Sequence, residues 1–166
     1  MDTEEFLRAI RDSLHAIQHP HFYNTERGFQ GELLAELRAR RPAFQAEEFM
    51  LVEQEHQKTL ANHNIKLRPD IIVHQPFDPA IHISRQQGNF AVIALKRGAG
   101  PKKATEDFMD LQRLMSALHY PLRIFININH SRTQVLHAPA LEESQTLVVF
   151  ATRLHEGGVN LAEDRA

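Results

Sequence analysis

The feature that most constrains the fold is a continuous apolar run, residues 90–95, that ends directly on Lys96 and Arg97. A strand without polar residues on either face is typical of the centre of a sheet that is covered on both sides. Gly98 and Gly100 then end the strand. Because burying an unpaired ammonium group is costly, a lysine at the end of such a strand indicates a carboxylate partner or a phosphate nearby.

Three helices are predicted around this strand. Hydrophobic residues recur at helical spacing in three segments, residues 2–18, 25–40 and 105–118. Asp2, followed by Glu5 three residues later, forms the pattern of a capping box at the start of the first helix. Thr105 is the expected cap of the last helix.

Six strands are predicted, the apolar run included, at residues 49–56, 71–73, 90–95, 122–128, 133–137 and 146–150. The residues from Glu156 onward are polar, and we expect them to fray. Two helices, a meander of three strands, a helical crossover and a further strand imply a mixed central sheet flanked by helices. The predicted class is therefore α/β.

Length and composition fit one domain of this kind. The 166 residues divide into an N-terminal helix within 1–20, a core over 25–137 and a frayed tail at 156–166. The chain has no cysteine and no apolar run long enough to span a bilayer, and its first residues are acidic. We therefore expect a cytoplasmic protein without thiolate metal sites. The net charge of -2 gives no overall attraction to nucleic acid, which leaves a local basic face as the route to binding it.

One constellation of residues carries possible chemistry. Ala94 and Lys96 are two positions apart on the apolar strand, so their side chains share one face of the sheet. Asp70 stands at the start of the strand before it. If these strands pair in sequence, Asp70 and Lys96 converge at one edge of the sheet.

These residues resemble the signature of the PD-(D/E)XK nuclease superfamily. Pro69-Asp70, an insertion, and then Ala94-Leu95-Lys96 on the next strand follow its pattern, and the resemblance covers residues 25–128. It implies a restriction-endonuclease-like αβββαβ core and an enzyme that hydrolyses DNA phosphodiester bonds with Mg²⁺, or with Mn²⁺ in its place. It also implies DNA as the partner, and a small nuclease that cuts both strands often forms a homodimer.

The resemblance assigns roles to individual residues. Asp70 matches the first metal-binding aspartate, and Lys96 matches the lysine that orients the attacking water and stabilises the developing charge. Glu32 resembles the glutamate that family members often carry on the helix before the sheet. The departure is at Ala94, where the family has an acidic residue, because a methyl group cannot bind a hard cation.

Three explanations of the alanine remain open, and we rank them in the order given. The first is an engineered replacement of glutamate, and the second is a natural inactive relative kept for binding nucleic acid. The third is migration of the carboxylate, with Glu55, Glu32 or Asp107 reaching the metal instead. Glu55 is a candidate because its strand precedes Asp70, although an exposed strand face explains it as simply.

Basic and polar residues follow the apolar strand and are candidates for contact with nucleic acid: Arg97, Lys102, Lys103, Gln112 and Arg113. The first three surround a glycine-rich turn, whose amides and neighbouring lysines could hold phosphates. A solvated loop is the alternative explanation. The function expected from the sequence is thus a metal-dependent nuclease disabled at Ala94. The rivals are a non-catalytic nucleic-acid-binding or assembly module on the same fold, and an unrelated α/β domain.

Overall fold

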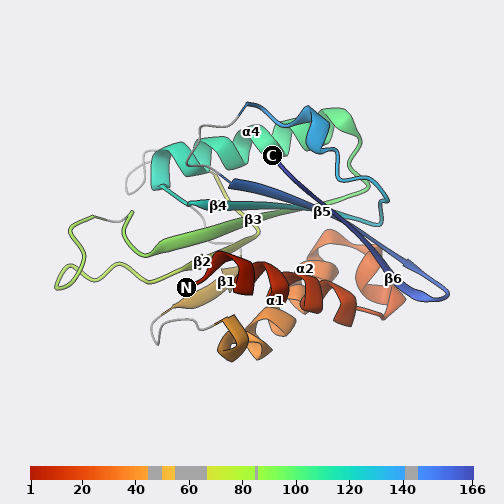
Figure 1. Ribbon diagram of the computed structural model, residues 1–166, viewed down its shortest axis with the longest axis horizontal. Helices are drawn as coiled ribbons and strands as arrows, with labels where there is room; N and C mark the ends of the chain where they lie inside the picture. Colours follow the sequence, from red (N-terminus) through yellow and green to blue (C-terminus); the bar gives the residue numbers. More distant parts are fainter. Residues whose placement is uncertain (45–49, 55–66, 85, 141–145) are drawn as a thin grey trace.

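A single mixed sheet lies between two layers of helices (Figure 1). The computed structural model describes residues 1–44, 50–54, 67–84, 86–140 and 146–166. The helices and strands are α1 (Thr3–Ala16), η1 (Pro20–Asn24), α2 (Glu26–Ala39), η2 (Arg41–Phe44), β1 (Leu51–Gln54), β2 (Ile71–His74), β3 (Asn89–Arg97), α4 (Pro101–Leu118), β4 (Leu122–Ile128), η3 (Val135–His137), β5 (Thr146–His155) and β6 (Gly158–Arg165). The predicted α/β class with a mixed central sheet is confirmed.

The strands lie in the sheet in the same order as in the chain, β1 to β6. β1, β2 and β3 form an antiparallel meander. β3, β4 and β5 are parallel, and α4 makes the crossover from β3 to β4. β6 then returns antiparallel along β5. β3 is thus the strand at which the antiparallel part of the sheet meets the parallel part.

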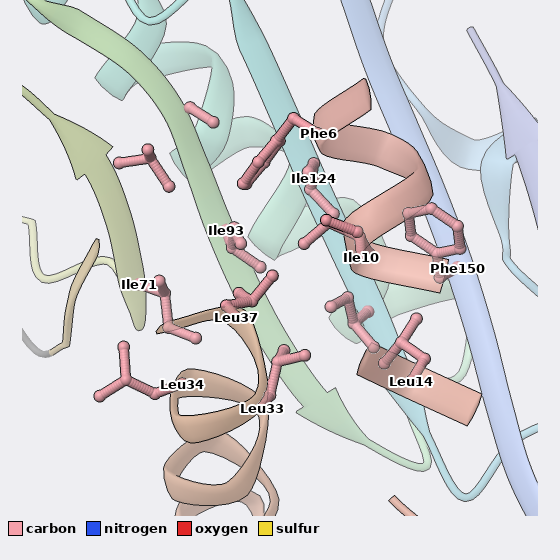
Figure 2. Close-up of a cluster of buried hydrophobic side chains, with 14 of the residues drawn as sticks. Phe6, Ile10, Leu14, Leu33, Leu34, Leu37, Ile71, Ile93, Ile124 and Phe150 are labelled. Carbon is pink, nitrogen blue, oxygen red and sulfur yellow. The ribbon is translucent and has the colours of Figure 1, made fainter. Parts of the chain in front are cut away.

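The two faces of the sheet bury two separate hydrophobic clusters. On one face α1 and α2 cover the sheet, and Figure 2 shows Phe6, Ile10 and Leu14 of α1 and Leu33 of α2 packed against the strands. On the other face α4 packs through every third or fourth residue, including Phe108. Full burial of one such side chain stabilises the fold by roughly 1.5–3 kcal/mol, so both helical layers are held mainly by this packing.

The first two helices are capped by the side chains of Asp2 and Thr25. Asp2 accepts a hydrogen bond from the backbone N–H of Glu5 at 2.9 Å, as the capping-box pattern predicts. Thr25 caps α2 by accepting from the N–H of Gly28 at 2.9 Å. The helix predicted at 105–118 is present as α4, but its predicted cap is wrong, because α4 begins at Pro101 and Thr105 lies inside it. Proline suits the first position of a helix, and Thr105 instead donates to the Pro101 carbonyl oxygen at 3.0 Å.

The predictions at the carboxyl-terminal end need two corrections. Residues 133–137 do not form a strand, since Gln134 has a φ of 66° and Val135–His137 is a short 3-10 helix. The tail from Glu156 is not frayed, because Gly158–Arg165 is strand β6. Its charged residues are paired with α1: Arg11 donates to Glu163 at 2.5 and 2.8 Å, and Arg165 donates to Glu4 at 2.6 Å. These contacts explain why a polar segment is ordered.

The predicted strand at 49–56 is described only in part. Residues 51–54 form β1, whereas residues 49, 55 and 56 lie outside the described residues. In the part of the chain that the structure describes, no helix is both long enough and apolar enough to cross a membrane.

Candidate functional site

The structure brings Asp70, Ala94 and Lys96 together in one pocket between the sheet and α4. Ile71 pairs with Ile93, and Ile72 pairs with Val92, so the residue before β2 falls opposite Ala94 on the neighbouring strand. Ile72 and Val92 contribute to the cluster under α4, and alternation along each strand places Asp70, Ala94 and Lys96 on that same face. The position without an acid is therefore the cross-strand neighbour of the aspartate.

Asp70 is held from two sides. Its Oδ2 accepts a hydrogen bond from the backbone N–H of Leu95 at 2.7 Å, across the gap to β3. Its carbonyl oxygen accepts from the side chain of Gln30 in α2 at 2.6 Å. Gln30 is almost fully buried. This glutamine is a positioning residue that the sequence did not single out, since a polar residue in a helix carries no signal of its partner.

Lys96 forms an ion pair with a carboxylate of α4. Its ammonium nitrogen lies 3.9 Å from Oδ1 of Asp107, and the lysine side chain is one-third exposed. Oδ2 of Asp107 is buried and has no hydrogen-bond partner among the described residues. Burial raises the pKa of Asp107 to about 6; Lys96 opposes that rise, while the nearby acids Asp70, Asp110 and Glu26 add to it. A carboxyl group that is hard to ionise thus faces the candidate catalytic lysine.

Glu26, rather than Glu32, is the glutamate of α2 at this pocket. Glu26 lies in the first turn of the helix and lines the pocket, and its Oε1 accepts from the backbone N–H of Arg97 at 3.0 Å. Glu32 is half-buried farther along α2 and is not among the described residues that line the pocket. The cap Thr25 places Glu26 in the first turn, and the packing of α2 against the end of β3 brings it to the site.

The acidic residues at this pocket do not complete a cation site by themselves. A hard cation such as Mg²⁺ needs several oxygen ligands in close to octahedral geometry. In the described ranges no three His, Asp or Glu side chains are arranged to hold a metal ion. Ala94 offers only a methyl group, and Asp107 faces Lys96. Glu55, the other candidate ligand, lies outside the described residues. The described residues therefore do not fit a resident Mg²⁺ ion.

The predicted nucleic-acid-binding residues divide into two kinds. Lys102 and Lys103 are exposed in the first turn of α4. Lys103 stands four positions before Asp107, so it projects on the side of the helix that borders the pocket. By contrast, Gln112 accepts a hydrogen bond from the buried guanidinium of Arg123, which directs its amide oxygen toward the sheet.

Two of the predicted arginines already have partners. The Nε of Arg97 donates to the carbonyl oxygen of Tyr23 at 3.0 Å, although the residue is exposed. Arg113 is exposed on α4 and pairs with Asp110 at 2.8 Å. Lys102 and Lys103 are thus the basic candidates that are exposed and make no ion pair with a described carboxylate.

The glycine-rich turn after Lys96 is fixed by a residue on the next strand. Gly98 has a φ of 61°, in the left-handed region that favours glycine, and its N–H donates to the Ile128 carbonyl oxygen at 2.8 Å. Asn127 is fully buried; its Oδ1 accepts from the Ala99 N–H at 2.8 Å, and its Nδ2 donates to the Ala99 carbonyl oxygen at 2.9 Å. Asn127 therefore sets where the chain leaves β3 and enters α4.

No protein-family model matches this chain, and neither the curated proteins nor the solved structures include a match. Arguments about function therefore depend on the residues and their geometry.

Proposed function

We propose that this chain is a PD-(D/E)XK nuclease domain with an incomplete active site, which binds DNA and hydrolyses it slowly or not at all. The observation that carries the proposal is the placement of Asp70 opposite Ala94, with Lys96 on the same face of the sheet. A coincidental match of short motifs would not be expected to put all three positions around one pocket.

The order of elements supports the fold half of the proposal. A helix, α2, precedes the meander of β1, β2 and β3, and α4 then crosses over to the parallel strand β4. This is the αβββαβ order of the restriction-endonuclease-like core. On this interpretation α1, β5 and β6 are additions that extend the sheet and cover one face.

Three residues at the pocket then have distinct parts in binding a DNA phosphate. Lys96 lies at the mouth of the pocket with its charge partly exposed, where it can neutralise a phosphate oxygen. Asp107 holds that lysine when no phosphate is present. Lys103 adds a positive charge on α4, one turn before Asp107. In a complete site of this family Mg²⁺ polarises the phosphate and activates water, and the acid missing at position 94 is the part that such a site requires.

Restoring the acid tests the catalytic half of the proposal. We expect Ala94→Glu to nick supercoiled plasmid DNA in the presence of Mg²⁺ or Mn²⁺ at least about 100-fold faster than the unmodified chain, because metal and general-base chemistry each contribute factors of this order. Ala94→Gln is the matched control, since it adds nearly the same volume without the charge. Adding Lys96→Ala to the Ala94→Glu variant should abolish the gained cleavage.

The outcomes separate the possibilities. If Ala94→Glu folds and binds DNA but does not cleave, the nuclease assignment is wrong and the non-catalytic binding module remains. If the unmodified chain does not bind DNA even at low salt, both the nuclease assignment and the binding-module assignment are wrong. Binding that weakens steeply with added salt, measured in EDTA, is expected from contacts with phosphates.

A further inference from the structure

The loop after β4 carries a basic residue that none of the motifs accounts for. Arg132 is exposed, and among the described residues no carboxylate lies within ion-pair distance of it. Four arginines among the described residues pair with carboxylates, namely Arg11, Arg40, Arg113 and Arg165, whereas Arg132 shares its lack of an ion pair with the exposed Arg8 and Arg153. An arginine kept exposed without a carboxylate partner suits the binding of an external anion.

The loop that carries Arg132 is joined to the glycine-rich turn through one buried side chain. The Nδ2 of Asn127 donates both to the Ala99 carbonyl oxygen at 2.9 Å and to the Arg132 carbonyl oxygen at 3.2 Å. Arg132 and the turn that leads from Lys96 into α4 are therefore attached to the same buried residue. This hydrogen bond holds the backbone at Arg132 next to the turn that precedes Lys102 and Lys103.

Further contacts hold the rest of the loop in place. The N–H of His130 donates to the Thr152 carbonyl oxygen at 3.2 Å, and the hydroxyl of Thr133 donates to Asp164 on β6. Val135 packs against the cluster under α4. Figure 1 shows this blue segment beside the green end of α4, where Pro101 begins the helix. A loop fixed at this many points presents Arg132 with little ordering entropy left to lose on binding.

We propose that Arg132 is a second contact with the DNA backbone, on the side of the α4 amino terminus away from the pocket. The basic residues then form a track that runs from Lys96 and Lys103 across Lys102 to Arg132. This inference rests on the proposed function, because it takes DNA to be the ligand of the pocket. It extends the proposed DNA-binding surface to the loop after β4, which lies outside the Asp70 and Lys96 motif.

The test measures binding of a duplex of about 20 base pairs in EDTA over a range of NaCl concentrations. Arg132→Ala should weaken binding about 3- to 10-fold at low salt and lower the slope of log K against log salt by about 0.9, the value for one phosphate contact. Arg132→Lys should retain most of the affinity, and Arg132→Glu should lose more than Arg132→Ala. Arg8→Ala is the matched control, since Arg8 is exposed on α1, on the opposite side of the sheet.

Three results would overturn the inference. If Lys103→Ala weakens binding while Arg132→Ala does not, the track ends at α4 and only this inference fails. If Arg8→Ala weakens binding as much as Arg132→Ala does, the effect is one of overall charge, and the inference fails as well. If the unmodified chain does not bind DNA, the inference and the proposed function fail together.

Discussion

Two carboxylates of this molecule lie in opposite electrostatic settings. Glu163 of β6 receives hydrogen bonds from Arg11 and Arg165, and the bond from Arg11 is the main reason that its pKa is lowered. Asp107 of α4 faces one lysine at 3.9 Å and three other acids, and burial raises its pKa to about 6. The first is placed where it stabilises the fold. The second is retained where its charge works against folding, which is typical of a functional site.

The largest effect on stability is expected from removing the carboxylate of Glu163, which accepts hydrogen bonds from Arg11 and Arg165. Glu163→Ala leaves Arg11 without its bidentate partner, and hydrogen bonds to charged groups contribute about 1.5–3 kcal/mol. We expect a loss of about 2 kcal/mol in the free energy of unfolding, measured with urea at pH 7. Glu156→Ala, an exposed position in the turn between β5 and β6, is the control. Equal losses in the two variants would show that the network does not stabilise the fold.

A smaller effect with a distinct pH dependence is expected at Asp107. Its pKa is raised to about 6 in the folded chain, against about 3.9 in an unfolded one, so protonation favours folding. The stability from this group is therefore fully present below about pH 4 and is lost as the pH rises through 6. Asp107→Asn should gain about 1–2 kcal/mol relative to the unmodified chain between pH 4 and pH 7.

The measurement is urea unfolding of both chains at pH 4, 5.5 and 7. Glu106→Gln removes an exposed carboxyl from the same helix that is not among the acids acting on Asp107, and it is the control. A constant difference between the Asp107→Asn variant and the unmodified chain at all three pH values would mean that this carboxyl is not raised in pKa, and the contrast with Glu163 would disappear.

The smallest effect on stability is expected at Arg165, the more exposed of the two arginines in the ion-pair network around Glu163 that joins α1 and β6. Arg165 bridges Glu4 and Glu163, and its side chain is nearly half exposed. Because salt screens exposed charges far more than buried ones, Arg165→Ala should cost less stability than Glu163→Ala, and the cost should vanish in 1 M NaCl. A cost that persists in high salt would indicate that packing of the arginine side chain, rather than its charge, holds β6 to α1.

Most of the central fold could be predicted from local patterns. The capping box at Asp2 and the mostly apolar segment at 122–128 each match an element of the structure, α1 and β4. In these segments the hydrophobic period and the turn residues agree. The strand pairing that brings Asp70 to Lys96 also follows, because a meander needs no long-range information beyond sequence order.

The errors come from residues whose partners are distant in sequence. The tail was predicted to fray because it is polar, but its charges meet residues of α1 more than 150 positions away, Glu163 with Arg11 and Arg165 with Glu4. Gly157-Gly158, with a φ of 119° at Gly158, was an available hairpin signal. Glu26 and Gln30 reach the site only through the packing of α2, which no periodicity reveals.

The order of the strands has a consequence for how the chain is made. Since the sheet runs β1 to β6 in chain order, every strand pairs with the one synthesised before it, and the sheet can grow along one advancing edge during translation. α1 is the exception, because its ion-pair partners lie on β6. The ion pairs between α1 and β6 can therefore form only after all the strands between them have been synthesised.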